Sequence, residues 1–287
     1  MQLQNVLVIG AGTMGSGIAQ WLVQAGLNVT LADNNYEQTE KAYTNIHKSW
    51  QDLLTKKKFS ETQTAQFKKN LQLQKLNDVT ADFDLVIEAI IEDLGIKKKL
   101  FQELDAKIQT SSIFASNTSS FSIEEIAKNL SSERKNKFIG LHFFNPATVM
   151  KLVEIIQTPD SNPEIAQDLY QWFEAKDKKP ALCKDSPAFI VNRVARNFYG
   201  EALRIVEQYD LEKIKEVDLV MKEVAGFKMG PFELMDLIGI DINYSVTTSV
   251  WNAYKKIDRF APHSLQKQMV DENKLGKKTK EGFYQYE

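Results

Sequence analysis

The chain has 287 residues, of which 43% are hydrophobic and 26% are charged, and its formal net charge is −2. This length and composition predict a globular protein with two domains, and the small net charge gives no electrostatic reason to expect nucleic acid or an acidic membrane as a partner. Every apolar run is shorter than the ~20 residues that a membrane-spanning helix needs.

The single cysteine, Cys183, cannot form an internal disulfide, which fits a reducing compartment. The first residues lead straight into a predicted strand, without the pattern of a signal or transit peptide. We therefore expect a cytoplasmic protein.

The first forty residues have the pattern of a dinucleotide-binding βαβ unit. Strands are predicted over residues 6–9 and 28–32, with a helix over 16–24 between them. In the turn after the first strand, Gly10 permits a tight bend, Gly12 lets the backbone approach a pyrophosphate, and Gly15 lets the helix pack close to the sheet. The following helix N-terminus attracts phosphate.

Asp33 ends the second strand and is predicted to bind the ribose hydroxyls of the dinucleotide. Because its carboxylate repels a 2′-phosphate, NAD is favoured over NADP. Flavin sites share the glycine pattern, so the motif alone leaves FAD open.

An inserted helical hairpin is predicted over 36–54 and 60–70, with Lys56-Lys57-Lys58 between the helices. The lysines fit either a solvated helix end or a contact for a phosphate-bearing part of the substrate. Further strands are predicted over 84–89, 111–116, 138–141, 151–156 and 181–183, and further helices over 94–109, from Ser122 onward and over 163–175.

Three side chains follow strand ends, at the edge where open α/β sheets bind ligands. Glu92 and Lys97 follow the strand over 84–89, and Ser119 follows the strand over 111–116. The alternative for Ser119 is a turn residue that satisfies backbone groups.

Beyond Lys184 the pattern is helical. Ser186 as N-cap and Pro187 as first helical residue predict a helix over 187–208. Helices are then predicted over 211–224, 232–238, 240–256 and 264–272. We expect a Rossmann-type doubly wound domain over 1–184 and an all-α domain over 185–287.

His142 stands at a predicted strand end, and Glu154 lies on the neighbouring predicted strand. A carboxylate on one imidazole nitrogen fixes the tautomer and raises basicity, so that the other nitrogen can take a proton. A hydroxyl oxidation coupled to hydride transfer needs such a pair. The alternative is a satisfied core histidine. The three histidines and one cysteine lack metal-ligand spacing, so no metal is expected.

Several motifs along the whole chain resemble 3-hydroxyacyl-CoA dehydrogenases. They are Gly-Ala-Gly-Thr-Met-Gly-Ser-Gly-Ile-Ala at 10–19, Ser-Asn-Thr-Ser-Ser at 116–120, His-Phe-Phe-Asn-Pro at 142–146, Met-Lys-Leu-Val-Glu at 150–154, Phe-Ile-Val-Asn-Arg at 189–193, Met-Gly-Pro-Phe-Glu-Leu at 229–234 and Gly-Lys-Lys-Thr at 276–279. The chain resembles the stand-alone form without a hydratase domain. The family often has glycine where Ala188 stands.

The resemblance implies a role for particular residues. His142 is the general acid/base and Glu154 its partner, while Ser119 and Asn192 bind the substrate near the reacting carbon. Ser49 and Lys56 correspond to coenzyme A contacts. Contacts to NAD are implied for Gly10, Ala11, Gly12, Thr13, Met14, Gly15, Asp33, Glu92, Lys97, Asn117, Ser119, Asn145 and Lys278. A homodimer formed through the helical domain is also implied.

The sequence therefore predicts an NAD-dependent dehydrogenase of (S)-3-hydroxyacyl-CoA, with 3-hydroxybutyryl-CoA as the expected substrate. A related dehydrogenase of a free hydroxy acid, such as a sugar acid or carnitine, is one alternative. A non-enzymatic NAD-binding structural protein is the other.

Overall fold

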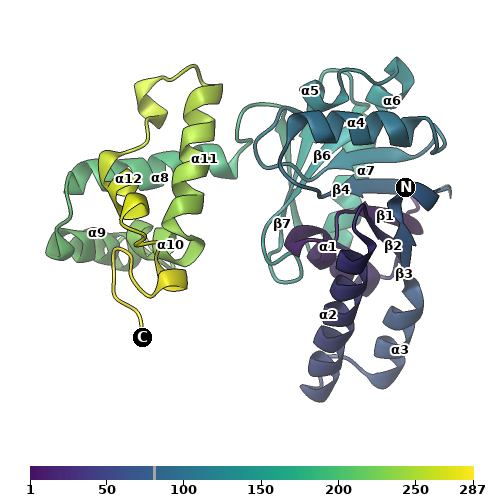
Figure 1. The fold of residues 1–287 in the computed structure, drawn as a ribbon, viewed down its shortest axis with the longest axis horizontal. Helices are drawn as coiled ribbons and strands as arrows, with labels where there is room; N and C mark the ends of the chain where they lie inside the picture. The colour runs from purple at the N-terminus through teal and green to yellow at the C-terminus, as the bar shows by residue number, and fades with distance from the viewer. Residues whose placement is uncertain (80–81) are drawn as a thin grey trace. The chain divides into compact units, whose positions relative to one another are not determined.

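The computed structural model describes residues 1–79 and 82–287. The chain divides into two compact units, Met1–Ser186 and Pro187–Glu287, two residues beyond the boundary expected after Lys184. The first unit holds the sheet, and the second is built from helices (Figure 1).

A doubly wound sheet organises the first unit. Among the described residues it has eight strands in the order β3-β2-β1-β4-β5-β6-β7-β8. These strands are β1 (Asn5–Ile9), β2 (Asn28–Asp33), β3 (Leu71–Lys75), β4 (Leu85–Glu88), β5 (Ile113–Ser116), β6 (Phe138–Phe143), β7 (Leu152–Gln157) and β8 (Lys179–Lys184). All neighbours are parallel except β6 and β7. The predicted Rossmann-type sheet is confirmed, and its order reverses at β1, where such sheets bind ligands.

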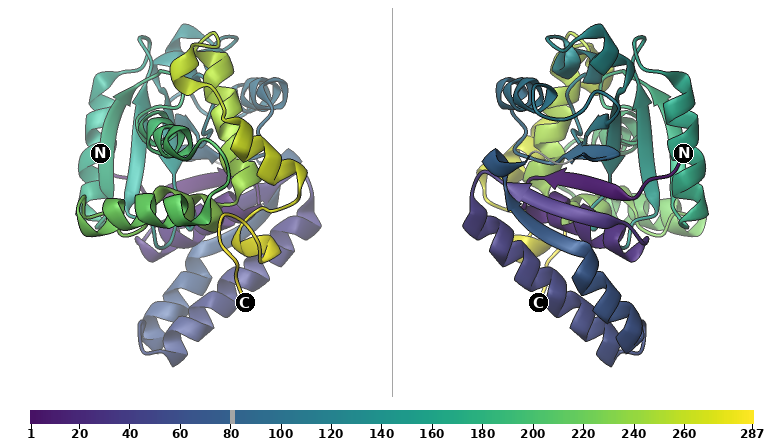
Figure 2. Two further views of the ribbon diagram at one scale, coloured as in Figure 1. Left: turned by 90° about the vertical axis from the view of Figure 1, so that its left-hand side faces the viewer. Right: turned by 90° about the vertical axis from the view of Figure 1, so that its right-hand side faces the viewer.

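The helices of this unit include the predicted hairpin. They are α1 (Thr13–Gln24), α2 (Tyr36–Thr55), α3 (Glu61–Asn70), α4 (Leu94–Asp105), α5 (Ile123–Ala127), α6 (Ser132–Asn136) and α7 (Pro163–Ala175), with a 3-10 turn η1 (Leu76–Asp78). α2 and α3 lie side by side and project together beyond the sheet (Figure 2). A capping box between Ser60 and Gln63 fixes the start of α3.

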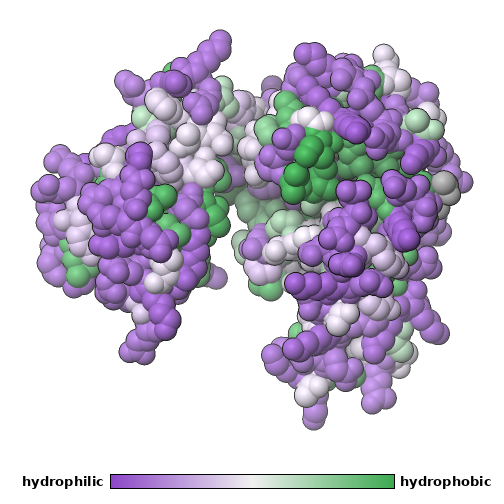
Figure 3. Space-filling view, in the orientation of Figure 1, coloured by the Kyte–Doolittle hydropathy of each residue, from purple (hydrophilic) through white to green (hydrophobic). Residues whose placement is uncertain are grey.

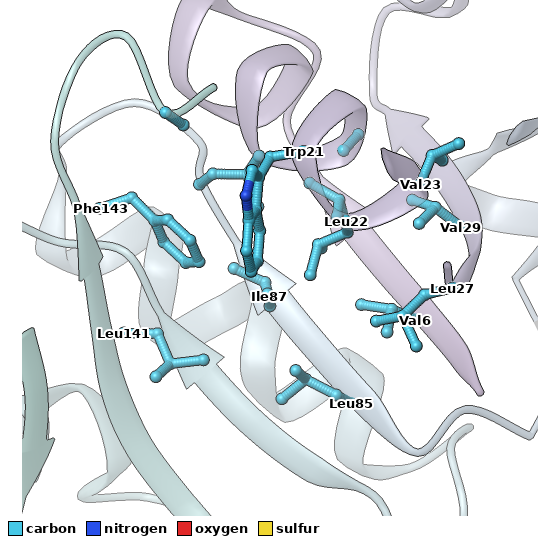
Figure 4. Packing of buried hydrophobic residues seen from close by; sticks show 14 of the residues in the cluster. Val6, Trp21, Leu22, Val23, Leu27, Val29, Leu85, Ile87, Leu141 and Phe143 are labelled. Atoms are coloured by element: carbon cyan, nitrogen blue, oxygen red, sulfur yellow. The ribbon is translucent and has the colours of Figure 1, made fainter. Parts of the chain in front are cut away.

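In the hydrophobic core of the first unit, α1 packs against strands on both sides of β1 in the sheet. Trp21 on α1 is stacked on Phe173, with ring centroids 5.7 Å apart, and lies 6.1 Å from the ring of Phe143 on β6. Figure 4 shows Trp21 between Phe143 and the apolar side chains that face it from α1 and β4. This packing fixes α1, and with it the glycine turn at its N-terminus, against the sheet.

The second unit is helical, as predicted. Its elements are α8 (Val191–Val206), α9 (Leu211–Glu223), α10 (Pro231–Ile238), α11 (Ile240–Ala253) and α12 (Ser264–Asp271), with 3-10 turns η2 (Asp258–Phe260) and η3 (Lys277–Thr279). Tyr199, Phe232 and Met235 lie in its core with Phe283, so the C-terminal segment packs back onto the helices.

The predicted start of the first of these helices is wrong. α8 begins at Val191 rather than at Pro187. Ala188 and Phe189 have φ angles of 67° and 50°, in the left-handed region, which a right-handed helix cannot include. The Ser186-Pro187 pair therefore precedes a turn and does not cap the helix.

Candidate active site

The glycine turn between β1 and α1 has the shape of a phosphate cradle. Gly10 has a φ of +106°, and a Cβ on Gly15 would lie 1.7 Å from the carbonyl oxygen of Gly10, so both positions require glycine. A Cβ on Gly12, by contrast, would meet no atom within 4 Å. The N-cap of α1 is Gly12, which supplies no side-chain hydrogen bond to the first-turn N–H groups, so a pyrophosphate could accept hydrogen bonds from them.

Asp33 at the end of β2 is tied to this turn. Its Oδ2 accepts a hydrogen bond from the Ala11 N–H at 2.7 Å, and its Oδ1 accepts one from Asn35 N–H at 2.8 Å. A carboxylate offers about four lone pairs, so each oxygen keeps capacity for a ribose hydroxyl. The residues present thus fit an NAD-type dinucleotide.

A buried ion-pair network joins the ends of β4 and β5. The Lys97 side chain, 1% exposed, donates to Glu88 Oε1 at 2.6 Å and lies 3.2 Å from Glu92 Oε2. Glu88 is fully buried and its Oε2 accepts from the Ser116 hydroxyl at 2.6 Å. Glu88 was not among the site residues predicted from the sequence. Its signal is a carboxylate that ends an otherwise apolar strand.

The loop after β5 is held by Glu92. One carboxylate oxygen of Glu92 accepts from the hydroxyls of Thr118 at 2.6 Å and Ser120 at 2.8 Å, and from the N–H of Ser119 at 3.1 Å. Burial would raise the pKa of Glu92, but the charge of Lys97 and these hydroxyl hydrogen bonds outweigh it, so the pKa is lowered. Glu92 and Lys97 therefore fix the backbone that carries Ser119.

His142 and Glu154 face one another across the antiparallel pair β6–β7. The two residues are in direct register, and His142 Nδ1 lies 2.7 Å from Glu154 Oε2. His142 is 6% exposed and Glu154 is fully buried. Asn117, from the loop after β5, accepts a hydrogen bond from the Phe143 N–H at 2.9 Å, so the loop that carries Ser119 also contacts the strand that carries His142.

Glu154 also contributes to the raised pKa of Cys183, the one cysteine of the chain. Burial, and then the negative charges of Glu154 and Asp185, raise the pKa of Cys183 to about 12. The thiol is therefore protonated at neutral pH and is a poor nucleophile.

The hairpin residues occupy different environments. Ser49 on α2 is half-buried and accepts a hydrogen bond from Gln20 on α1 at 3.0 Å. Lys56, at the C-terminal end of α2, is exposed, as are the two lysines after it. The surface of the hairpin is largely hydrophilic (Figure 3).

The remaining predicted residues are spread between the two units. Asn145 is exposed in the loop after β6. Asn192 is half-buried on α8 of the second unit, and Lys278 in η3 forms an ion pair with Asp241, at 2.5 Å and 2.6 Å.

The described residues contain neither a metal-ligand cluster nor a membrane-spanning helix. No group of three or more His, Cys, Asp or Glu side chains there has the arrangement of a metal site. No helix in the described ranges combines the length and apolar character needed to cross a bilayer.

Two family models together match almost the whole chain. The model described as "3-hydroxyacyl-CoA dehydrogenase, NAD binding domain" matches residues 5–186, and that described as "3-hydroxyacyl-CoA dehydrogenase, C-terminal domain" matches residues 189–286.

Individual relatives agree with these models. The human mitochondrial hydroxyacyl-coenzyme A dehydrogenase is 41% identical over 99% of this chain and 91% of its own length. The 3-hydroxyadipyl-CoA dehydrogenase of Escherichia coli K12 is 39% identical over 100% of this chain, which spans 60% of that protein. A crystal structure of 3-hydroxybutyryl-CoA dehydrogenase from Escherichia coli K12 superposes with a TM-score of 0.94 at 39% identity, again over 100% of this chain and 60% of the other.

The fold, the dinucleotide turn and these matches lead to one conclusion. The chain belongs to the 3-hydroxyacyl-CoA dehydrogenase family and is an NAD-dependent dehydrogenase.

Proposed function

We propose that the enzyme interconverts (S)-3-hydroxyacyl-CoA and 3-oxoacyl-CoA with His142 as the general acid/base. The observation that carries this proposal is the 2.7 Å contact between His142 Nδ1 and Glu154 Oε2. Both side chains are buried, and His142 lies near the carboxyl end of β6, the edge of the sheet at which the glycine turn follows β1. The pair has the geometry of a base held by an acid.

In this proposal Glu154 accepts the Nδ1 proton of His142, and Nε2 is the nitrogen that takes the substrate proton. During oxidation Nε2 takes the proton of the 3-hydroxyl group, and the negative charge of Glu154 stabilises the imidazolium that results. During reduction the imidazolium returns this proton to the carbonyl oxygen. NAD, when bound, supplies the hydride acceptor.

We assign substrate binding to four further residues on the strength of the family resemblance. Ser119 and Asn192 hydrogen-bond the substrate near the reacting carbon, and Ser49 and Lys56 bind coenzyme A. The network through Glu92 supports this role for Ser119, because it holds the Ser119 backbone in place.

For NAD, we assign contacts to the turn, to Asp33 and to the loops beyond. The full set is Gly10, Ala11, Gly12, Thr13, Met14, Gly15, Asp33, Glu92, Lys97, Asn117, Ser119, Asn145 and Lys278. In this assignment Lys97 acts by orienting Glu92, because its ammonium is buried between two carboxylates.

The acyl chain is proposed to be short, with 3-hydroxybutyryl-CoA as the substrate. The relatives differ in the acyl chain that their names give: one is a 3-hydroxybutyryl-CoA dehydrogenase and another a 3-hydroxyadipyl-CoA dehydrogenase. We further propose that residues 1–184 bind NAD, that residues 185–287 contribute to substrate binding and to a homodimer, as the family suggests, and that the enzyme is cytoplasmic, in keeping with its single cysteine.

Steady-state reduction of acetoacetyl-CoA by NADH tests the function. We expect turnover by the wild type and, for His142→Gln, a fall in kcat of about 10²–10⁴-fold with NADH affinity retained. His263→Asn is the matched control, because His263 caps α12 and asparagine also caps helices well. Normal turnover by His142→Gln would refute the assignment of the base.

The alternatives give different results in the same assays. A higher kcat/KM for free 3-hydroxybutyrate or gulonate than for the thioester would favour the free hydroxy acid. Tight NADH binding without turnover of any hydroxyacyl substrate would favour a structural role, although membership of this enzyme family argues against it.

A further inference from the structure

Gln20 is a buried polar side chain that joins two helices of the first unit. It is 9% exposed and precedes Trp21 on α1, which lies in the core. Its Nε2 donates a hydrogen bond to the hydroxyl oxygen of Ser49 on α2 at 3.0 Å. A buried amide needs such a partner, because the loss of its hydration is otherwise uncompensated. The bond therefore fixes Ser49 relative to the helix that begins at the glycine turn.

The Ser49 hydroxyl differs from the hydroxyls of the two threonines nearest to it on α2. Thr44 and Thr55 each donate to the carbonyl oxygen of the residue four positions earlier, at 2.9 Å and 3.0 Å, as hydroxyls inside helices commonly do. In the part of the chain that the structure describes, Ser49 only accepts, from Gln20. Because a serine hydroxyl has one hydrogen to donate, that of Ser49 remains available to a ligand.

Ser49 and Lys56 are placed to bind one extended ligand. Ser49 is half-buried, and Lys56 is exposed and follows seven residues later. Seven residues are about two helical turns, so the two residues share a face of α2 and lie roughly 10 Å apart along its axis. A hydroxyl donor and an ammonium group at this spacing suit a ligand that carries several phosphate oxygens.

We propose that Gln20 is a positioning residue for coenzyme A. By donating to the Ser49 oxygen, Gln20 directs the hydroxyl hydrogen away from α2 and toward an oxygen atom in the nucleotide part of coenzyme A. This inference rests on the proposed function, which assigns Ser49 to coenzyme A. It adds that the thioester is positioned from α1, the helix whose first turn is assigned to NAD.

A double-mutant cycle tests the coupling between Gln20 and Ser49. Gln20→Met keeps an unbranched side chain but cannot donate, so the serine hydroxyl is free to turn back toward its own helix. We expect the KM for acetoacetyl-CoA to rise about three- to tenfold, as in Ser49→Ala, with kcat changed less than about threefold. The double variant should show no larger rise than Ser49→Ala alone. If Gln20→Met raises KM by the same factor with and without the Ser49 hydroxyl, the inference is overturned.

A substrate without the nucleotide separates positioning from general damage to the fold. Acetoacetyl-N-acetylcysteamine keeps the reacting acyl group and the thioester, so its kcat/KM should change less than about twofold in Gln20→Met, as should the KM for NADH. Equal losses on both thioesters would show a purely structural role and overturn the inference. Gln66→Met changes an exposed glutamine on α3 of the same hairpin and is the matched control, expected to behave as the wild type.

Gln20→Glu provides a second test if Gln20→Met does not fold. The carboxylate keeps the shape of the side chain but only accepts, so it takes the Ser49 hydroxyl hydrogen and should raise the KM for acetoacetyl-CoA on the order of tenfold. The same change in the Ser49→Ala background measures the repulsion of anionic coenzyme A alone and should have a smaller effect. An equal effect in both backgrounds would overturn the inference.

The same measurements separate failure of the inference from failure of the proposed function. No turnover of any thioester by the wild type refutes the proposed function. An unchanged KM for acetoacetyl-CoA in Ser49→Ala refutes the assignment of Ser49 to coenzyme A, and the inference with it. A raised KM in Ser49→Ala that neither Gln20 variant shares refutes only the inference.

Discussion

The ammonium group of Lys178 lies 4.5 Å from the centroid of the Trp21 ring. Lys178 is 3% exposed, and its Nζ donates to the carbonyl oxygens of Ala147 and Met150, both at 2.6 Å. These two carbonyls belong to the loop that follows β6 and carries Asn145. A cation packed against an aromatic ring of the core thus anchors a loop to which we assign an NAD contact.

Lys178→Met keeps an unbranched apolar stem but removes the cation and leaves two carbonyls without their donor. We expect the free energy of unfolding to fall by about 2–3 kcal/mol and the KM for NADH to rise. Urea unfolding and steady-state kinetics measure these effects. Lys176→Met, which removes an exposed lysine 6.0 Å from the Trp172 ring, is the control and should change stability by less than about 0.5 kcal/mol. Equal effects in the two variants would contradict the anchoring role.

The same substitution to alanine should have different effects at two glycines of the dinucleotide turn: at one it should lower stability, and at the other it should weaken NADH binding. Gly15→Ala places a methyl group 1.7 Å from the Gly10 carbonyl oxygen, so we expect a loss of stability of about 3 kcal/mol or more. Gly12→Ala meets no protein atom within 4 Å, so the fold should survive while NADH binding weakens at least about tenfold. Thermal unfolding and NADH titration separate the two. Unchanged NADH binding in Gly12→Ala would exclude a pyrophosphate at this turn.

The parts of the fold with strong local patterns could be predicted from the sequence. The apolar run of β1, the glycines after it and Asp33 lie within forty residues, so local spacing alone identified the unit. β3 was missed although Leu71–Lys75 alternates leucine with polar residues, because the segment is short and directly follows α3. It forms by pairing with β2, a contact that composition does not show.

The candidate site residues that follow strand ends could be predicted from the sequence. Contacts between residues on different elements were harder to predict. Two adjacent predicted strands suggested that Glu154 could reach His142, but they did not predict the direct antiparallel register of the two residues. Glu88 was missed because its partner Lys97 lies on the next helix, and only the packing of α4 brings the two together. The start of α8 was misplaced because local capping rules cannot anticipate the left-handed backbone at Ala188, a position where the family often has glycine.

Glu154→Gln tests the partner of His142 directly. Glutamine has nearly the same shape but cannot bear the negative charge that stabilises the imidazolium in the proposed mechanism. We expect kcat for acetoacetyl-CoA reduction to fall about 10²-fold or more, with NADH affinity preserved. Glu174→Gln, on the exposed surface of α7, should behave as the wild type. A kcat within threefold of the wild type would show that the charge of Glu154 does not support catalysis.

Glu92 should make stability depend on pH in the acid range. Its pKa is lower in the folded state than its ordinary value of 4.5, since Lys97 and the hydroxyls of Thr118 and Ser120 favour the charged form against the effect of burial. The folded state therefore binds this proton less readily than the unfolded state. The stabilisation is complete above pH 4.5 and is lost as the pH falls through the folded-state pKa.

The comparison of wild type with Glu92→Gln across pH 7 to 3 measures this effect. The difference in unfolding free energy should be about 1 kcal/mol or less near neutral pH, because the side chain is 38% exposed and solvent screens its ion pair. It should shrink below pH 4.5. Glu103→Gln, whose carboxylate lies 3.9 Å from Lys99 on the exposed face of α4, should show a smaller difference at every pH. If the difference in unfolding free energy between wild type and Glu92→Gln stays constant down to pH 3, the loop that carries Ser119 is held by the shape of residue 92 and not by its charge.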